Sequence, residues 1–174
     1  MASVAAFPDP DAAIVKALGD FCVAFLKDGD DAPLVIRGYM NRVSRPAGRD
    51  YILITPMNMT RLATNRHNWR GLDGVSAITQ PARRRVQIDC YGDCAAVWAK
   101  TLSTLLRDSL ACDALASYGI APLFVEDPQD LTALEGDGQI HPRYMLGLMI
   151  QADEIVSVKL DYFNDVNLIL KPQA

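Results

Sequence analysis

The hydrophobic period changes in the middle of residues 86–106, and this change constrains the fold more than any other feature of the sequence. Apolar residues first alternate with polar or aromatic ones, at Val86, Ile88 and Cys90, as in a strand with one buried face. After Gly92 the apolar residues recur at helical spacing. They are Trp98, Leu102, Leu105 and Leu106. A strand therefore leads directly into a helix, predicted to run from about Asp93 to Ala111, with Gly92 at the corner.

A second amphipathic helix is predicted near the start of the chain. Asp9-Pro10-Asp11 combines a capping residue, a proline for the first helical position and an acid near the positive helix end. The apolar positions that follow at spacings of three and four are Ile14, Leu18, Phe21, Cys22 and Phe25. Four to five turns are expected, ending at residues 28–33.

The remaining segments are predicted to be strands and turns. Strands are expected at residues 34–43, after which residues 46–48 form a turn, and at residues 50–65, where Pro56 predicts an edge, a bulge or a kink. A loop at residues 71–76 precedes the third strand, which ends at residue 91. Later come a short strand at residues 122–125, a turn at residues 126–128, a Gly-rich turn after residue 134 and a long final strand from residue 144. Residues 144–150 are apolar on both faces, which predicts a central strand, and residues 164–174 are expected to form an edge strand or a docked arm.

This order predicts a single α+β domain over residues 1–174, with a mainly antiparallel sheet and two main helices packed on one face. Half of the residues are apolar and 22% are charged, as in an ordinary globular protein. The net charge of −4 does not favour tight binding of nucleic acid by the whole chain. No secretion signal and no membrane-spanning run are expected.

Residue patterns for catalysis or metal binding are weak. The turn at Gly92 lacks the glycines and the Lys-Ser/Thr pair of a phosphate loop, and it lacks the flanked nucleophile of a hydrolase elbow. The spacing of Cys90 and Cys94 fits neither a redox nor a zinc motif, so these two are interpreted as small buried hydrophobes. All four cysteines, Cys22, Cys90, Cys94 and Cys112, are interpreted as reduced thiols. The two histidines, His67 and His141, are interpreted as solvated loop residues. No catalytic residue, metal or cofactor is therefore predicted.

Two groups of arginines are the candidate interaction residues. Arg83, Arg84 and Arg85 lie together at a strand end, and Arg61, Arg66 and Arg70 lie near Trp69. A solvated strand end would explain them without function, whereas contact with DNA or with an acidic partner would make them functional. The acidic turns at residues 28–31 and 126–130 are candidate partners, because they would bring carboxylates from a neighbouring subunit.

Four stretches resemble, in the same order, the neck or tail terminator proteins of long-tailed bacteriophages. They are YILITPMNMTRLATNRHNW, RRRVQIDCYGDCAAVWAKTLSTLLRDSL, GIAPLFVEDPQDL and QIHPRYMLGLMIQADEIVSVKLDYFNDVNL. Together they span about residues 34–168, and the ordered set, not one motif, carries the resemblance. The resemblance implies an antiparallel sheet packed with helices and a structural role instead of catalysis.

The resemblance further implies a homo-oligomeric ring, usually of six copies, located in the neck or tail of the virion and assembled in the host cytoplasm. Its expected partners are the tail tube protein and the head-side connector, with a sheath protein as a further candidate. DNA would pass through the lumen without specific binding. The alternatives are another tail-tube, baseplate or head-completion protein, or, from a different class, a small hydrolase that uses His67 or His141 with a turn carboxylate.

Overall fold

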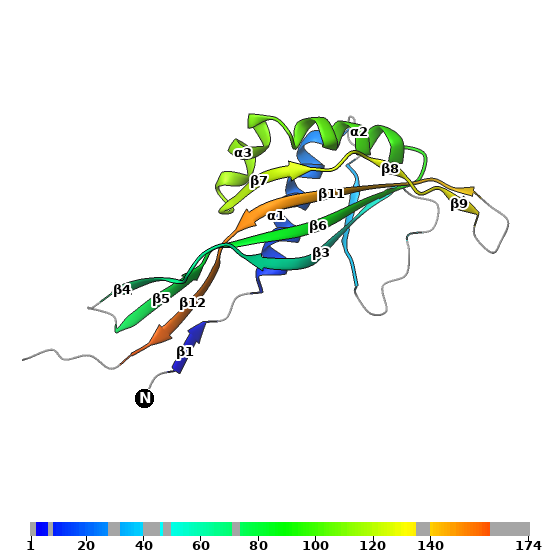
Figure 1. The fold of residues 1–174 in the computed structure, drawn as a ribbon. Helices are drawn as coiled ribbons and strands as arrows, with labels where there is room; N and C mark the ends of the chain where they lie inside the picture. Colours follow the sequence, from blue (N-terminus) through cyan, green and yellow to red (C-terminus); the bar gives the residue numbers. More distant parts are fainter. Residues whose placement is uncertain are drawn as a thin grey trace, which may run out of the picture.

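The structure is a computed structural model of the 174-residue chain. It describes residues 3–6, 9–27, 32–39, 46, 50–70, 74–134 and 140–160. Three helices and three sheets, of six, four and two strands, make up the described part of the fold, which is elongated (Figure 1). The α+β class predicted from the sequence is confirmed.

The six-stranded sheet forms the body of the molecule. Its strands lie in the order β2 (Leu34–Arg37), β3 (Tyr51–Arg61), β6 (Ala82–Tyr91), β11 (Arg143–Ala152) and β7 (Ile120–Val125), and the short β8 (Gln129–Asp130) also pairs with β11. β11 lies between β6 and β7, which confirms the predicted central strand. The two-stranded ribbon of β9 (Ala133–Leu134) and β10 (Ile140–His141) lies beside it.

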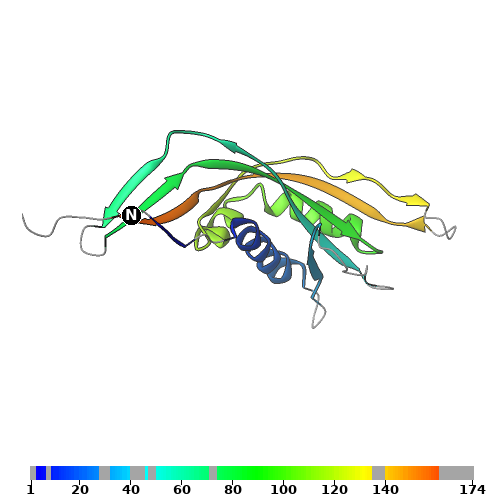
Figure 2. The same cartoon turned by 90° about the horizontal axis from the view of Figure 1, so that it is seen from below.

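All three helices pack on one face of this sheet, on the concave side of the bent strands (Figure 2). α1 (Pro10–Leu26) covers β2 and β3, α2 (Ala95–Leu105) covers β6 and β11, and α3 (Ser109–Ala116) covers β7. Alternate residues of β6 point into this layer, so Val86, Ile88 and Cys90 are fully buried, as their period of two predicts. On α1, Phe25 was predicted to share the apolar face, but its side chain is 38% exposed and Leu26 is buried instead.

Three long strand paths continue beyond the helices into a second sheet, which we call the distal sheet. β3 leads into β4 (Arg66–Arg70), β5 (Val75–Gln80) leads into β6, and β11 leads into β12 (Glu154–Lys159). The distal sheet has the strand order β1 (Ser3–Ala6), β12, β5, β4 and is antiparallel throughout. Its β5 begins at Val75, inside the segment that the sequence predicted to be a loop. A register shift between Pro56 and Met59 confirms the bulge predicted in the second strand.

Gly92 forms the corner between β6 and α2 by a conformation that only glycine adopts easily. Its φ is +97°, and a Cβ there would overlap the carboxylate of Asp50. That carboxylate accepts hydrogen bonds from the backbone N–H groups of Asp93 and Cys94, at 3.0 Å each. The N-cap residue of α2, Cys94, has no side-chain capping bond of its own, so a residue distant in sequence caps this helix. The corner is thus a structural joint.

Two sequence predictions are wrong at the level of elements. The helix predicted over residues 93–111 is split into α2 and α3, because Asp108 accepts a hydrogen bond from the N–H of Leu110 and starts a new helix. The strand predicted over residues 34–43 ends at Arg37, and this strand, β2, pairs parallel to β3. The turn predicted at residues 46–48 falls largely outside the described part. Residues 40–45, 47–49 and the predicted tail at residues 164–174 lie outside the described part.

Replacing Leu102 with alanine is expected to lower the free energy of unfolding by about 2–5 kcal/mol, because its side chain is fully buried between α2 and the sheet. Val97 on the same helix is 65% exposed, so Val97→Ala is the matched control and should change stability by less than about 0.5 kcal/mol. Urea denaturation followed by circular dichroism measures both. Equal losses would mean that α2 does not pack as described.

Trp98 and Leu105, predicted to be buried, are only partly buried against the same core.

Candidate functional site

The distal sheet exposes much of its outer strands. It extends beyond the three helices, which cover the six-stranded sheet (Figure 1). All the described side chains of β4 are exposed, and Trp69 shows 45% of its surface. On β12, Ile155 is 51% exposed. A sheet with so little cover within its own chain is a candidate surface for contact with another protein.

The two faces of the distal sheet differ in chemistry. The register of β4, β5 and β12 places Arg66 and Asn68 beside Ala77 and Thr79, followed by Ile155 and Ser157, on one face. The opposite face carries His67 and Trp69, then Ser76 and Ile78, then Val156 and Val158. One face is therefore basic and polar, while the other continues the apolar, helix-covered side of the body.

Arg84 does not belong to an exposed basic cluster. Arg84 is only 8% exposed. Its guanidinium forms ion pairs with Asp11 at the start of α1, at 2.5 Å, and with Glu154 at the start of β12. Its Nε is buried without a hydrogen-bond partner in the described structure. Arg84 therefore ties the first helix to the junction of the two sheets, a role that its position in an arginine triplet does not reveal.

Arg85 is also paired within the chain. Its guanidinium lies 2.8 Å from a carboxylate oxygen of Glu126, one of the acids that the sequence analysis offered as a partner for a neighbouring subunit. The pair crosses β11 at Gly147, where a Cβ would overlap the Glu126 carboxylate. At this position the acidic turn therefore binds an arginine of its own chain.

The other candidate arginines remain on the surface. Arg83 is exposed on the face of β6 away from the helices, and Arg66 is exposed on β4; neither has an ion pair in the described part of the chain. The exposed Arg61 donates from Nε to the carbonyl of Ala63 at 2.8 Å. Arg70 ends β4, and its side chain lies outside the described part, as do the acids of residues 28–31. Arg83, Arg61 and Arg66 are therefore the described arginines available to a partner.

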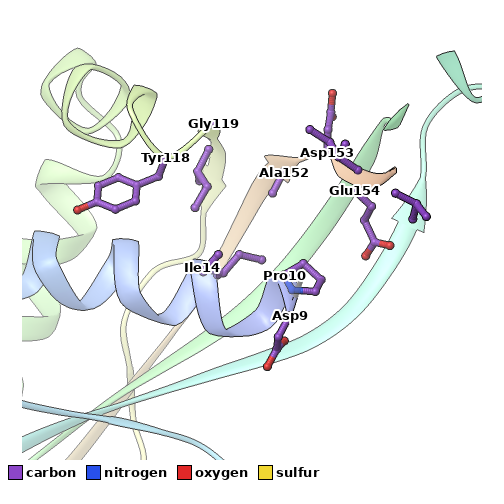
Figure 3. Close-up of a pocket in the computed structure, with 12 residues that line it drawn as sticks. Asp9, Pro10, Ile14, Tyr118, Gly119, Ala152, Asp153 and Glu154 are labelled. Carbon is purple, nitrogen blue, oxygen red and sulfur yellow. The ribbon is translucent and has the colours of Figure 1, made fainter. Parts of the chain in front are cut away.

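An apolar pocket of about 190 Å³ lies where the body meets the distal sheet (Figure 3). Pro10, Ala13 and Ile14 of α1 face Ile120 of β7 and Val156 of β12 across it. Carboxylates stand at its rim, on Asp9, Asp153 and Glu154. The hydrogen bond from Arg37 lowers the pKa of Asp9, whose other oxygen caps α1. The lining offers apolar contact and few polar groups, which suits packing and not catalysis.

A buried ion pair on the face opposite the helices was not identified from the sequence. Asp89 is 1% exposed and accepts hydrogen bonds from Arg143 at 3.1 and 2.9 Å and from Gln87 at 2.8 Å. The Arg143 guanidinium also lies over the ring of Tyr91, which stacks on Tyr51. The alternating pattern of β6 placed Asp89 on this face, but only the pairing of β6 with β11 brings Arg143 to it.

The two histidines do not form a common site. His67 is exposed on β4 and His141 is exposed on β10, at opposite ends of the molecule (Figure 1). Both lie in strands, and not in the loops predicted for them. Within the described ranges, no group of three or more His, Cys, Asp or Glu side chains could hold a metal ion. No helix in this part of the chain is long and apolar enough to span a membrane.

The cysteines divide into two pairs by burial. Cys90 is buried as predicted, whereas the burial predicted for Cys94 is wrong. Burial raises the pKa of Cys22 to about 12 and raises that of Cys90 further, whereas Cys94 and Cys112 are exposed. A thiol reagent at pH 8 is therefore expected to modify two cysteines in the folded protein and all four after unfolding, as read by absorbance or mass spectrometry. Modification of Cys22 or Cys90 in the folded protein would contradict this expectation.

Comparison with known proteins identifies the chain. No curated protein matched the sequence, but the model of one family did, described as phage neck terminator protein, over residues 12–172. The match covers the six-stranded sheet, the three helices except the first residues of α1, three of the four distal strands and both groups of arginines, whereas β1 lies before it. The chain therefore belongs to the phage neck terminator family and is a structural protein of the phage tail.

Proposed function

We propose that this protein is a tail terminator subunit that forms a homo-oligomeric ring, with six copies as the expected number. The ring caps the tail tube and joins it to the head-side connector, and the genome passes through its lumen. Assembly takes place in the host cytoplasm, and a sheath protein is a further candidate neighbour. The family match supports a place in the neck or tail of the virion.

The observation that carries this proposal is the uncovered distal sheet. Within the described part of the chain, no helix lies over β4, where Trp69 is 45% exposed, although helices cover the adjoining sheet. Exposed apolar side chains of this kind are stabilised when another chain covers them. In a ring every copy presents the same surface to the next copy. The exposed sheet therefore favours an assembling subunit over a compact monomeric enzyme.

The ion pairs within the chain reduce the number of candidate arginines that can contact another subunit or the tube. Arg84 and Arg85 have acidic partners in their own chain, so we assign subunit or tube contact to Arg83, Arg61 and Arg66, with Arg70 as a further candidate. Repetition around the ring axis turns each exposed arginine into a charged band. We favour protein contact over DNA contact, since DNA must slide and strong phosphate binding would hold it.

Light scattering on the purified chain, alone and with the tail tube protein, tests the ring. A mass of about six subunits, or assembly that rises with protein concentration, is expected. A compact monomer that never joins tubes would overturn the proposal, and turnover of a test ester or glycoside would favour a hydrolase. Rings that join no tube would point instead to a baseplate or head-completion protein.

The double variant Arg66→Glu, Arg83→Glu is expected to weaken assembly and to make it sensitive to salt, while the circular dichroism spectrum stays that of the folded chain. Arg84 must be left intact, because its loss would disturb the contact between α1 and β12. Arg107→Glu is the matched control, since this exposed arginine pairs with Asp127 of its own chain. If the double variant forms normal rings but particles fail to retain or eject DNA, these arginines line the channel and the assignment is wrong.

A further inference from the structure

We infer that neighbouring copies join their distal sheets edge to edge, with β4 of one copy pairing with β1 of the next. This inference rests on the ring proposed above and names the contact that builds it. It starts from the strand order β1-β12-β5-β4, in which β1 and β4 are the two ends. Among the described residues, each of these strands therefore has a ladder partner on one side only.

The strand directions make the two edges complementary. β1 is antiparallel to β12, β12 is antiparallel to β5, and β5 is antiparallel to β4. It follows that β1 and β4 run in opposite directions within one copy. Rotation about a ring axis preserves the direction of strands that run along that axis, so with the strands in this orientation β4 and the β1 of the next copy are also antiparallel. The added pair continues the pattern of the sheet without a break.

The lengths and positions of the two strands fit the same contact. β4 has five residues and β1 has four, and no proline interrupts either strand. Both lie in the part of the molecule that extends beyond the helices (Figure 1), so a second copy reaches them without meeting the helix layer. Two different edges meet in this contact, and such head-to-tail contacts form a ring when the rotation from one copy to the next closes.

The pairing also protects the open strand edges against aggregation. An open strand edge offers N–H and C=O groups to any other extended chain and promotes aggregation. Joining β4 to β1 around a closed ring removes both edges from every copy at once. Strand addition of this kind supplies affinity through main-chain hydrogen bonds, which explains why β4 and β1 need no distinctive side-chain motif.

Disulfide trapping tests the contact. The background carries Cys94→Ser and Cys112→Ser, which removes the exposed thiols and leaves the buried Cys22 and Cys90. Asn68→Cys on β4 is combined in turn with Val4→Cys, Ala5→Cys and Ala6→Cys on β1. Three positions are used because the proposal does not fix which residue of β1 lies opposite Asn68. Opposed residues of an antiparallel pair have Cα atoms about 4.5–5.5 Å apart, within reach of a disulfide. The matched control replaces Asn68→Cys by Ala77→Cys on β5, one strand further from the edge, which is too far to bond to β1.

For at least one β1 position, mild oxidation of the assembled protein is expected to move most of the monomer band into a ladder of covalent multimers, lost on reduction, while the Ala77→Cys controls stay monomeric. Rings confirmed by light scattering that give no ladder at any of the three positions overturn the edge pairing and leave the ring intact. A dimer formed by Asn68→Cys alone overturns it as well, since that dimer needs a twofold contact of β4 with β4. If the parent protein forms no ring, even with tube protein, both the ring and the edge pairing fail.

Discussion

Replacing Arg143 with methionine is expected to lower the free energy of unfolding by about 3–5 kcal/mol, the usual cost of leaving a buried charge without its partner. The carboxylate of Asp89 is 1% exposed and receives two of its three hydrogen bonds from Arg143. Methionine keeps the apolar stem but removes the guanidinium that lies over Tyr91. Urea denaturation of the isolated chain measures the loss.

Arg85→Met is the control for this experiment. It removes another ion pair of a β6 residue on the same face of the sheet, yet Arg85 is 44% exposed and Glu126 is 29% exposed. Water solvates the remaining Glu126 carboxylate after the change, so the expected loss is below about 1 kcal/mol. Similar losses in the two variants would contradict the claim that burial of Asp89 sets the cost.

Replacing Gly92 with alanine is expected to lower the free energy of unfolding by about 3 kcal/mol. The positive φ disfavours any side chain by roughly 1–2 kcal/mol, and the new Cβ would also displace the Asp50 carboxylate that caps α2, which costs about 1–2 kcal/mol more. Thermal or urea unfolding gives the value.

Gly119→Ala separates the two contributions. Gly119 has a φ of +69°, but a Cβ there would meet no atom within 4 Å, so only the backbone strain of about 1 kcal/mol is expected. In an Asp50→Ala background the excess cost of Gly92→Ala should disappear, since the cap is already lost. An unchanged cost in that background would show that the overlap with Asp50 contributes nothing.

Local sequence patterns were sufficient for several elements of the body, although not for the break between α2 and α3. The alternation of Val86, Ile88 and Cys90 and the proline at the start of α1 are short-range signals, and each element forms where such a signal lies. Residues 144–150 are apolar on both faces, and this predicted a central strand because a strand that is covered on both faces has no face in contact with water. The family resemblance extended these predictions to a tail protein, which the family match over residues 12–172 confirms.

Contacts between residues far apart in sequence decided the rest. Three contacts join residues that are many positions apart in sequence: the parallel pairing of β2 with β3, the capping of α2 by Asp50 and the pair of Asp89 with Arg143. The hydrophobic periods of two and 3.6 residues describe only neighbouring positions, so they do not predict such contacts.

The arginine triplet shows the same limit, because the strand pleat directs its adjacent side chains to opposite faces of the sheet. Arg84 points into the junction and pairs there, whereas Arg83 and Arg85 point to the other face. The sequence alone determined where most strands and helices of the body lie and that three arginines are adjacent; only the tertiary structure decided which of those arginines is available to a partner, because strand pairing sets the neighbours of every side chain.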